Sequence, residues 1–209
     1  MTILIICCFA LTLGVCLPGY IRDKRGRWAL HLKWLGTFSA AVMGIAGAVR
    51  FGGAGWLCAA GLFVCAIADV VLEKQFYAGM ACFAAGHVCY VAWFLTRAPL
   101  GVTHLLAFLV LMAVSLVTIH CWTGIRNRQA LPLMGYALFL SLMGACGVGC
   151  APLGVSGLTT AVGAVLFVAS DMMVYRGLLK PWGRKADTFA MGIYYGAQLL
   201  FGLSCLLGG

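Results

Sequence analysis

The stretch FAAGHVCYVAWFL, residues 83–95, is apolar enough to form most of a membrane-spanning helix, yet it carries an ionisable ring and a phenol. His87 and Tyr90 stand three residues apart, so they share one face of that helix. Polar side chains inside a membrane are costly and usually have a function. The stretch therefore predicts a buried helix that contributes to a polar site.

The remainder of the chain has the same apolar character. Hydrophobic residues make up 64% of its 209 residues and charged residues 9%, whereas soluble domains carry about 25% charged residues. This composition predicts an integral membrane protein of the all-α class, because a span must satisfy its own backbone hydrogen bonds. We expect a single transmembrane domain over residues 1–209. The net charge of +9 lies in short loops, so it favours contact with membrane lipid and not with nucleic acid.

Eight apolar segments can be recognised, each of about 17 to 21 residues and long enough to cross a bilayer. Gly, Pro and charged residues separate them, as is typical of loops. The predicted spans cover residues 2–18, 31–49, 56–72, 77–95, 101–121, 131–149, 157–175 and 189–207.

Basic residues alternate from loop to loop. Only Arg50 and Arg97 follow spans 2, 4 and 6. The other loops and the start of span 2 hold Arg22, Lys24, Arg25, Arg27, Lys33, Lys74, Arg126, Arg128, Arg176, Lys180, Arg184 and Lys185. The positive-inside rule makes this richer side cytoplasmic and places both termini on the non-cytoplasmic side.

The two halves of the chain resemble each other. GLFVCAIADVVLEK in span 3 is similar to AVLFVASDMMVYRG in span 7, and their aspartates, Asp69 and Asp171, lie near the same end of the two spans. Four spans in each half give both halves the same orientation. The pattern therefore predicts a four-plus-four parallel repeat.

Several polar residues fall within the predicted spans: Lys33, Asp69, His87, Tyr90, Tyr136, Asp171, Tyr194, Tyr195 and Gln198. The rise of 1.5 Å per residue places both aspartates roughly 6 Å below the cytoplasmic boundary and His87 about two helical turns deeper. We expect a pocket open to the cytoplasmic side with His87 toward its floor. Purely structural roles stay open: ion pairs for the aspartates, interhelical hydrogen bonds for His87 and Gln198, packing for the tyrosines and snorkelling for Lys33.

The 11 cysteines include no CxxC pair, and most lie in apolar runs. Free cysteine in such surroundings behaves as a small hydrophobic residue. The sequence predicts no cofactor and no metal.

Five segments together resemble the YhhN-type lysoplasmalogenases, a family of eight-span membrane hydrolases. They are AIADVVL (66–72), AAGHVCY (84–90), GYALFLSLMGA (135–145), LFVASDMMV (166–174) and YYGAQLLFGL (194–203). The chain departs from the family pattern at two places, with Ala68 before Asp69 and Trp34 after Lys33.

The resemblance implies hydrolysis of the sn-1 vinyl ether bond of a lysophospholipid to a fatty aldehyde and glycerophospho-ethanolamine or glycerophospho-choline. Such chemistry needs an acid that protonates carbon and a negative charge beside the resulting oxocarbenium ion, a division that two carboxyl groups can supply. We expect Asp69 and Asp171 to be the catalytic pair, with His87 placing water or relaying a proton. Substrate contacts are expected from Lys33, Tyr90, Tyr194 and Gln198. Short loops favour a bacterial inner membrane, and a eukaryotic endomembrane stays open as the alternative.

Two other classes of function stay open. A parallel repeat with polar residues inside the membrane is also typical of transporters of lipids or small molecules. A metal-dependent lipid amidase or esterase would need Asp69, His87 and Asp171 as zinc ligands.

Overall fold

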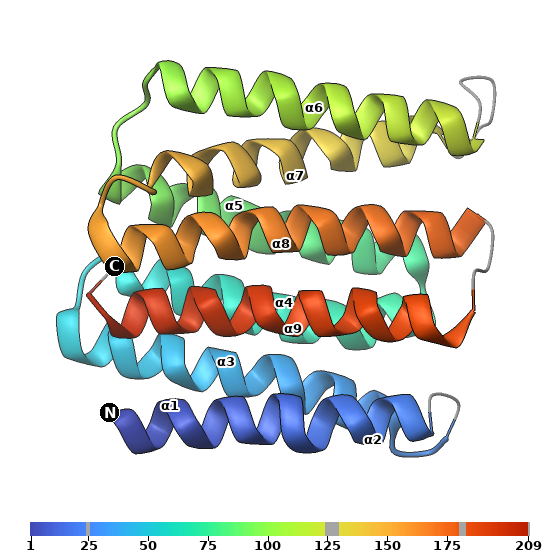
Figure 1. Ribbon diagram of the computed structural model, residues 1–209, viewed down its shortest axis with the longest axis horizontal. Helices are drawn as coiled ribbons and strands as arrows, with labels where there is room; N and C mark the ends of the chain where they lie inside the picture. Colours follow the sequence, from blue (N-terminus) through green and yellow to red (C-terminus); the bar gives the residue numbers. More distant parts are fainter. Residues whose placement is uncertain (24–25, 124–129, 180–182, 209) are drawn as a thin grey trace.

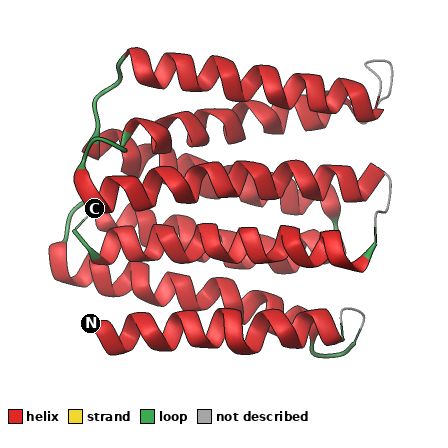
Figure 2. Ribbon diagram, viewed as in Figure 1, coloured by secondary structure: helices red, strands yellow, loops and turns green. Residues whose placement is uncertain are grey.

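The computed structural model describes residues 1–23, 26–123, 130–179 and 183–208, and these residues form an all-helical bundle (Figures 1 and 2). In chain order the helices are α1 (Thr2–Phe9), η1 (Ala10–Cys16), α2 (Leu17–Arg22), α3 (Ala29–Phe51), α4 (Gly55–Lys74), α5 (Phe76–Arg97), α6 (Val102–Thr123), α7 (Ala130–Gly149), α8 (Gly154–Leu179) and α9 (Arg184–Leu206). Of the basic residues assigned to the cytoplasmic loops, Lys24, Arg25, Arg126, Arg128 and Lys180 lie outside the described residues.

Eight helical spans in the described part of the chain are long and apolar enough to cross a membrane, which confirms the predicted number. Segments α1, η1 and α2 together form the first span, Thr2–Arg22, which is longer than the predicted 2–18. Pro18 does not end this span, because the π-helical turn η1 precedes it and gives the proline ring more room than an α-helical turn would.

The first span and α6 lie at opposite edges of the bundle in Figure 1 and bury few of their residues. The other six spans bury about half of their residues or more and form the interior. Within it, α3 packs on α4 and α9, α5 packs on α4 and α7, and α8 packs on α7 and α9. This arrangement leaves the polar faces of α3, α4, α5, α7, α8 and α9 directed at one another.

Both termini lie at one end of the bundle, as an even number of spans requires (Figure 1). At the opposite end, α4 and α5 are joined through Gln75 alone. The two helices can meet so closely because residue 79 is glycine: a Cβ atom there would lie 2.4 Å from the Cα of Leu72. This tight junction holds the cavity-lining ends of α4 and α5 together.

Candidate active site

A cavity of about 460 Å³ opens between the helices at the end of the bundle opposite the termini. Its volume lies within the range typical of small-molecule sites. Helices α2, α3, α4, α5, α7, α8 and α9 line it, with Tyr20, Lys33, Asp69, Leu72, Glu73, Phe76, Met80, Phe83, Tyr136, Ser170, Asp171, Met173, Val174, Tyr175, Gly177, Asp187, Ala190, Met191 and Tyr194.

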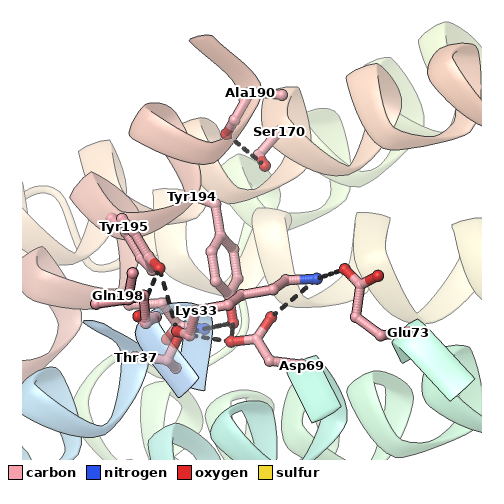
Figure 3. A network of polar contacts seen from close by, with 10 residues as sticks. Lys33, Thr37, Asp69, Glu73, Ser170, Ala190, Tyr194, Tyr195 and Gln198 are labelled. Atoms are coloured by element: carbon pink, nitrogen blue, oxygen red, sulfur yellow. Dashed lines mark hydrogen bonds and ion pairs between the residues drawn. The ribbon is translucent and has the colours of Figure 1, made fainter. Parts of the chain in front are cut away.

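Asp69 is held by hydrogen bonds from two other helices (Figure 3). Thr37 Oγ1 on α3 donates to its Oδ2 atom at 2.6 Å, and the Tyr194 hydroxyl on α9 donates to the same atom at 3.0 Å. Lys33 Nζ lies 3.8 Å from the other carboxylate oxygen, Oδ1. Only 1% of Asp69 is exposed, so these contacts fix the orientation of its carboxylate.

Tyr90 and Gln198 form a chain of hydrogen bonds behind Tyr194. The Tyr90 hydroxyl donates to Gln198 Oε1 at 2.7 Å, and Gln198 Nε2 donates to the Tyr194 hydroxyl at 3.1 Å. Both side chains are fully buried, and neither lines the cavity. The three residues thus form one hydrogen-bonded chain, but only Tyr194 lines the cavity.

Asp171 has an equivalent set of contacts from the other side of the bundle. The Tyr136 hydroxyl on α7 donates to its Oδ2 atom at 2.6 Å, and His87 Nε2 on α5 lies 2.9 Å from the same hydroxyl. Since the phenol proton is given to Asp171, His87 Nε2 must donate to the phenol oxygen. The other ring nitrogen, Nδ1, is buried without a partner among the described residues.

The expectation that His87 lies two turns deeper than the aspartates is wrong for Asp171. His87 Nε2 is 3.9 Å from Asp171 Oδ2, with the Tyr136 hydroxyl bonded to both groups. Helix α8 continues to Leu179, past the predicted end of this span at residue 175, so Asp171 lies deeper in its helix than a count from residue 175 gives. His87 itself is fully buried and does not line the cavity.

Two phenylalanines fill the space between the Asp69 and Asp171 networks. The Phe167 ring makes edge contacts with Tyr194 at 5.5 Å and with His87 at 5.0 Å between ring centroids. Phe83 contacts both Phe167 and Tyr194. Aromatic rings in such edge contacts have well-defined positions, so they fix the two polar networks relative to each other.

Acidic residues gather around this cavity, although the chain as a whole is strongly basic. Four of the five carboxylates in the sequence line it: Asp69, Glu73, Asp171 and Asp187. Lys33 also lines it and donates to Glu73 Oε1 at 2.9 Å. A basic protein that places four acidic side chains at one cavity has a candidate site for acid–base chemistry there.

Thr37, Glu73, Tyr136 and Tyr175 belong to this site but were not predicted as site residues. Helical spacing could have indicated three of them, since Thr37, Glu73 and Tyr175 lie four residues after Lys33, Asp69 and Asp171. The contact between Tyr136 and Asp171 depends on how α7 packs on α8, which helical spacing alone does not predict.

The zinc-ligand set Asp69, His87 and Asp171 is not assembled. Among the described residues, no three His, Cys, Asp or Glu side chains come together as a metal site would require. His87 approaches Asp171 through the Tyr136 hydroxyl instead of presenting a free nitrogen beside it.

Residues 28–205 match the YhhN family, and the chain belongs to it. It is also 31% identical over 155 residues to a curated relative, lysoplasmalogenase TMEM86B of Rattus norvegicus. The matched region covers 72% of this chain and 62% of the relative, so the chain spans less than two thirds of that protein's length. No solved structure matched the chain.

Proposed function

We propose that this protein is a lysoplasmalogenase that hydrolyses the sn-1 vinyl ether bond of lysoplasmenyl-ethanolamine or lysoplasmenyl-choline. The observation that carries the proposal is the pair of carboxyl groups, Asp69 and Asp171, held in separate hydroxyl-bonded positions on one cavity. The family membership and the relative named as a lysoplasmalogenase support it.

In the proposed reaction, one carboxyl group transfers its proton to the vinyl carbon remote from the ether oxygen. The electron pair of the double bond forms the new C–H bond and leaves an oxocarbenium ion, which the second carboxylate stabilises by its charge. Water adds to the cationic carbon and gives up a proton to a carboxylate. The resulting hemiacetal gives up its hydroxyl proton as its carbon–oxygen bond to glycerol breaks, and the departing glycerol oxygen takes up a proton. The products are a fatty aldehyde and glycerophospho-ethanolamine or glycerophospho-choline.

The surrounding residues would hold these groups in place. Thr37 and Tyr194 orient Asp69, and Tyr90 and Gln198 orient Tyr194 from behind. The hydrogen-bonded chain from His87 through Tyr136 would carry a proton to or from Asp171. Lys33 would bind the phosphate at the mouth of the cavity.

The membrane arrangement is part of the same proposal. The cavity lies at the basic end of the bundle, so it would open to the cytoplasmic side, with both termini outside. We propose one domain over 1–209 in a bacterial inner membrane. The contacts support the four-plus-four repeat: Asp69 on α4 is bonded from α3 and α9, and Asp171 on α8 is linked to the corresponding α7 and α5.

Aldehyde release from detergent-purified protein tests the proposal. Aldehyde is expected from a vinyl-ether lysophospholipid, none from its saturated alkyl-ether analogue, and no loss of rate in the presence of a chelator. Asp69→Asn and Asp171→Asn should each abolish turnover while the protein stays folded, whereas Asp23→Asn, outside the cavity, should not. Full turnover by both cavity variants would refute the carboxyl mechanism. No aldehyde from folded wild-type protein would favour a transporter.

A further inference from the structure

The cavity has a second polar level, one helical turn nearer its mouth than the two aspartates. Three helices each carry a polar residue at both levels, separated by four positions and hence by about 6 Å along the helix. The inner and outer partners are Thr37 and Lys33 on α3, Asp69 and Glu73 on α4, and Asp171 and Tyr175 on α8. All three outer residues line the cavity.

Tyr175 differs from the other outer residues because its hydroxyl is unsatisfied. Its side chain is only 3% exposed, and within the described part of the chain the hydroxyl has no hydrogen-bond partner. The ring packs edge-on against Tyr136 at 5.7 Å between centroids. Buried polar groups are nearly always paired, so a buried hydroxyl without a partner at a cavity indicates a group that a ligand would satisfy.

Lys33 provides a positive charge at the same level. Only 7% of this residue is exposed, and its ammonium group donates to Glu73, whose side chain is half-exposed. The ammonium is thereby kept at the cavity. An uncharged donor, Tyr175, and a charged one, Lys33, thus line the outer level.

The spacing of the two levels matches the dimensions of the proposed substrate. Five bonds separate the vinyl ether oxygen from the phosphorus atom of a lysophospholipid, which is about 6 Å for an extended chain. A vinyl ether placed between the aspartates would therefore put its phosphate at the level of Tyr175 and Lys33. The headgroup amine would bring a positive charge to the carboxylates of Glu73 and Asp187.

We propose that Tyr175 is a substrate-binding residue whose hydroxyl donates a hydrogen bond to the phosphate of the lysophospholipid, beside the ammonium of Lys33. The identity of the lipid rests on the proposed function, but the assignment of a phosphate-binding level does not require the reaction to occur.

Ligand binding without catalysis provides the test. A saturated alkyl-ether lysophosphoethanolamine and a phosphate-free alkylglycerol are titrated into wild-type protein and Tyr175→Phe in detergent. The variant should bind the phospholipid roughly tenfold more weakly and the alkylglycerol equally well. Its melting temperature should not fall, because the lost hydroxyl has no hydrogen-bond partner among the residues that the structure describes.

Tyr195→Phe is the matched control. The Tyr195 hydroxyl donates to the backbone carbonyls of Leu32 and Lys33, and this residue does not line the cavity. The control should therefore lose thermal stability and retain both affinities, the reverse of the result expected for Tyr175→Phe.

Three results would overturn the proposal: unchanged phospholipid affinity in Tyr175→Phe, an equal loss of affinity for both lipids, or a lowered melting temperature with intact binding. Inorganic phosphate is titrated alone, and binding as tight as that of the phospholipid would overturn the assignment to a lipid headgroup. Aldehyde release is measured separately, so failure of the proposed reaction is distinguishable from failure of the phosphate contact.

Discussion

Replacement of Tyr136 by Phe removes the hydroxyl that links His87 to Asp171 and little else. The phenyl ring keeps its contacts with His87 and Tyr175, at 5.4 and 5.7 Å between centroids. The hydrogen bonds of 2.6 Å to Asp171 and 2.9 Å to His87 are both lost. His87 and Asp171 cannot replace these bonds by bonding to each other, because 3.9 Å separates His87 Nε2 from Asp171 Oδ2.

The loss should affect turnover more than stability. A hydrogen bond to a charged group contributes about 1.5–3 kcal/mol, and each 1.4 kcal/mol on the barrier changes the rate about tenfold. We therefore expect kcat for aldehyde release to fall about 10- to 100-fold. Interhelical hydrogen bonds in membranes average only about 0.6 kcal/mol of stability, because the separated helices find other partners. The melting temperature should fall by a few degrees at most.

A double-mutant cycle with His87→Leu shows whether the three residues act as one unit. If they do, the double variant should be no slower than the slower single variant, because either change already breaks the chain. Rate losses that multiply would refute a relay. Wild-type kcat in folded Tyr136→Phe would refute any role of this hydroxyl in catalysis.

Three further predictions concern other parts of the bundle. Lys33→Gln should raise KM for the vinyl-ether phospholipid about tenfold or more, since it removes the ammonium expected to bind phosphate, and steady-state kinetics would detect this. Gly61→Ala should lower both the melting temperature and kcat, because the new Cβ would lie 2.6 Å from the Tyr90 ring, whereas Gly135→Ala, with open space around it, should be near neutral in both assays. Arg97→Gln should lower the melting temperature without altering KM, because the guanidinium bonds three hydroxyls far from the cavity; an altered KM would contradict this.

The number of spans could be predicted, and the two aspartates could be singled out, because both follow from the cost of placing polar groups in lipid. Charge inside an apolar segment is rare, so Asp69 and Asp171 stood out. Thr37 did not, because a threonine in a span can return its hydroxyl to its own helix and carries little signal. Its bond to Asp69 depends on the packing of α3 on α4.

Relative depth was the weakest part of the sequence-based interpretation. The depths of His87 and Asp171 were each counted from the predicted end of their span. Helix α8 runs on to Leu179, beyond the predicted end at residue 175, so Asp171 lies about 12 Å from the end of its helix and not about 6 Å. A helix can thus continue past the last apolar residue of a span, so a depth counted from that residue is too small.

The partners of each aspartate come from both halves of the chain: Tyr194 of the second half bonds Asp69 of the first, and His87 of the first half is linked to Asp171 of the second. Neither half could assemble a complete site alone. A symmetric dimer of half-length chains would be forced to give its two carboxyl groups identical surroundings. Joining the halves in one polypeptide removes that constraint, so one aspartate can lie beside a lysine and the other near a histidine. Covalent linkage thereby allows Asp69 and Asp171 to have chemically unequal surroundings.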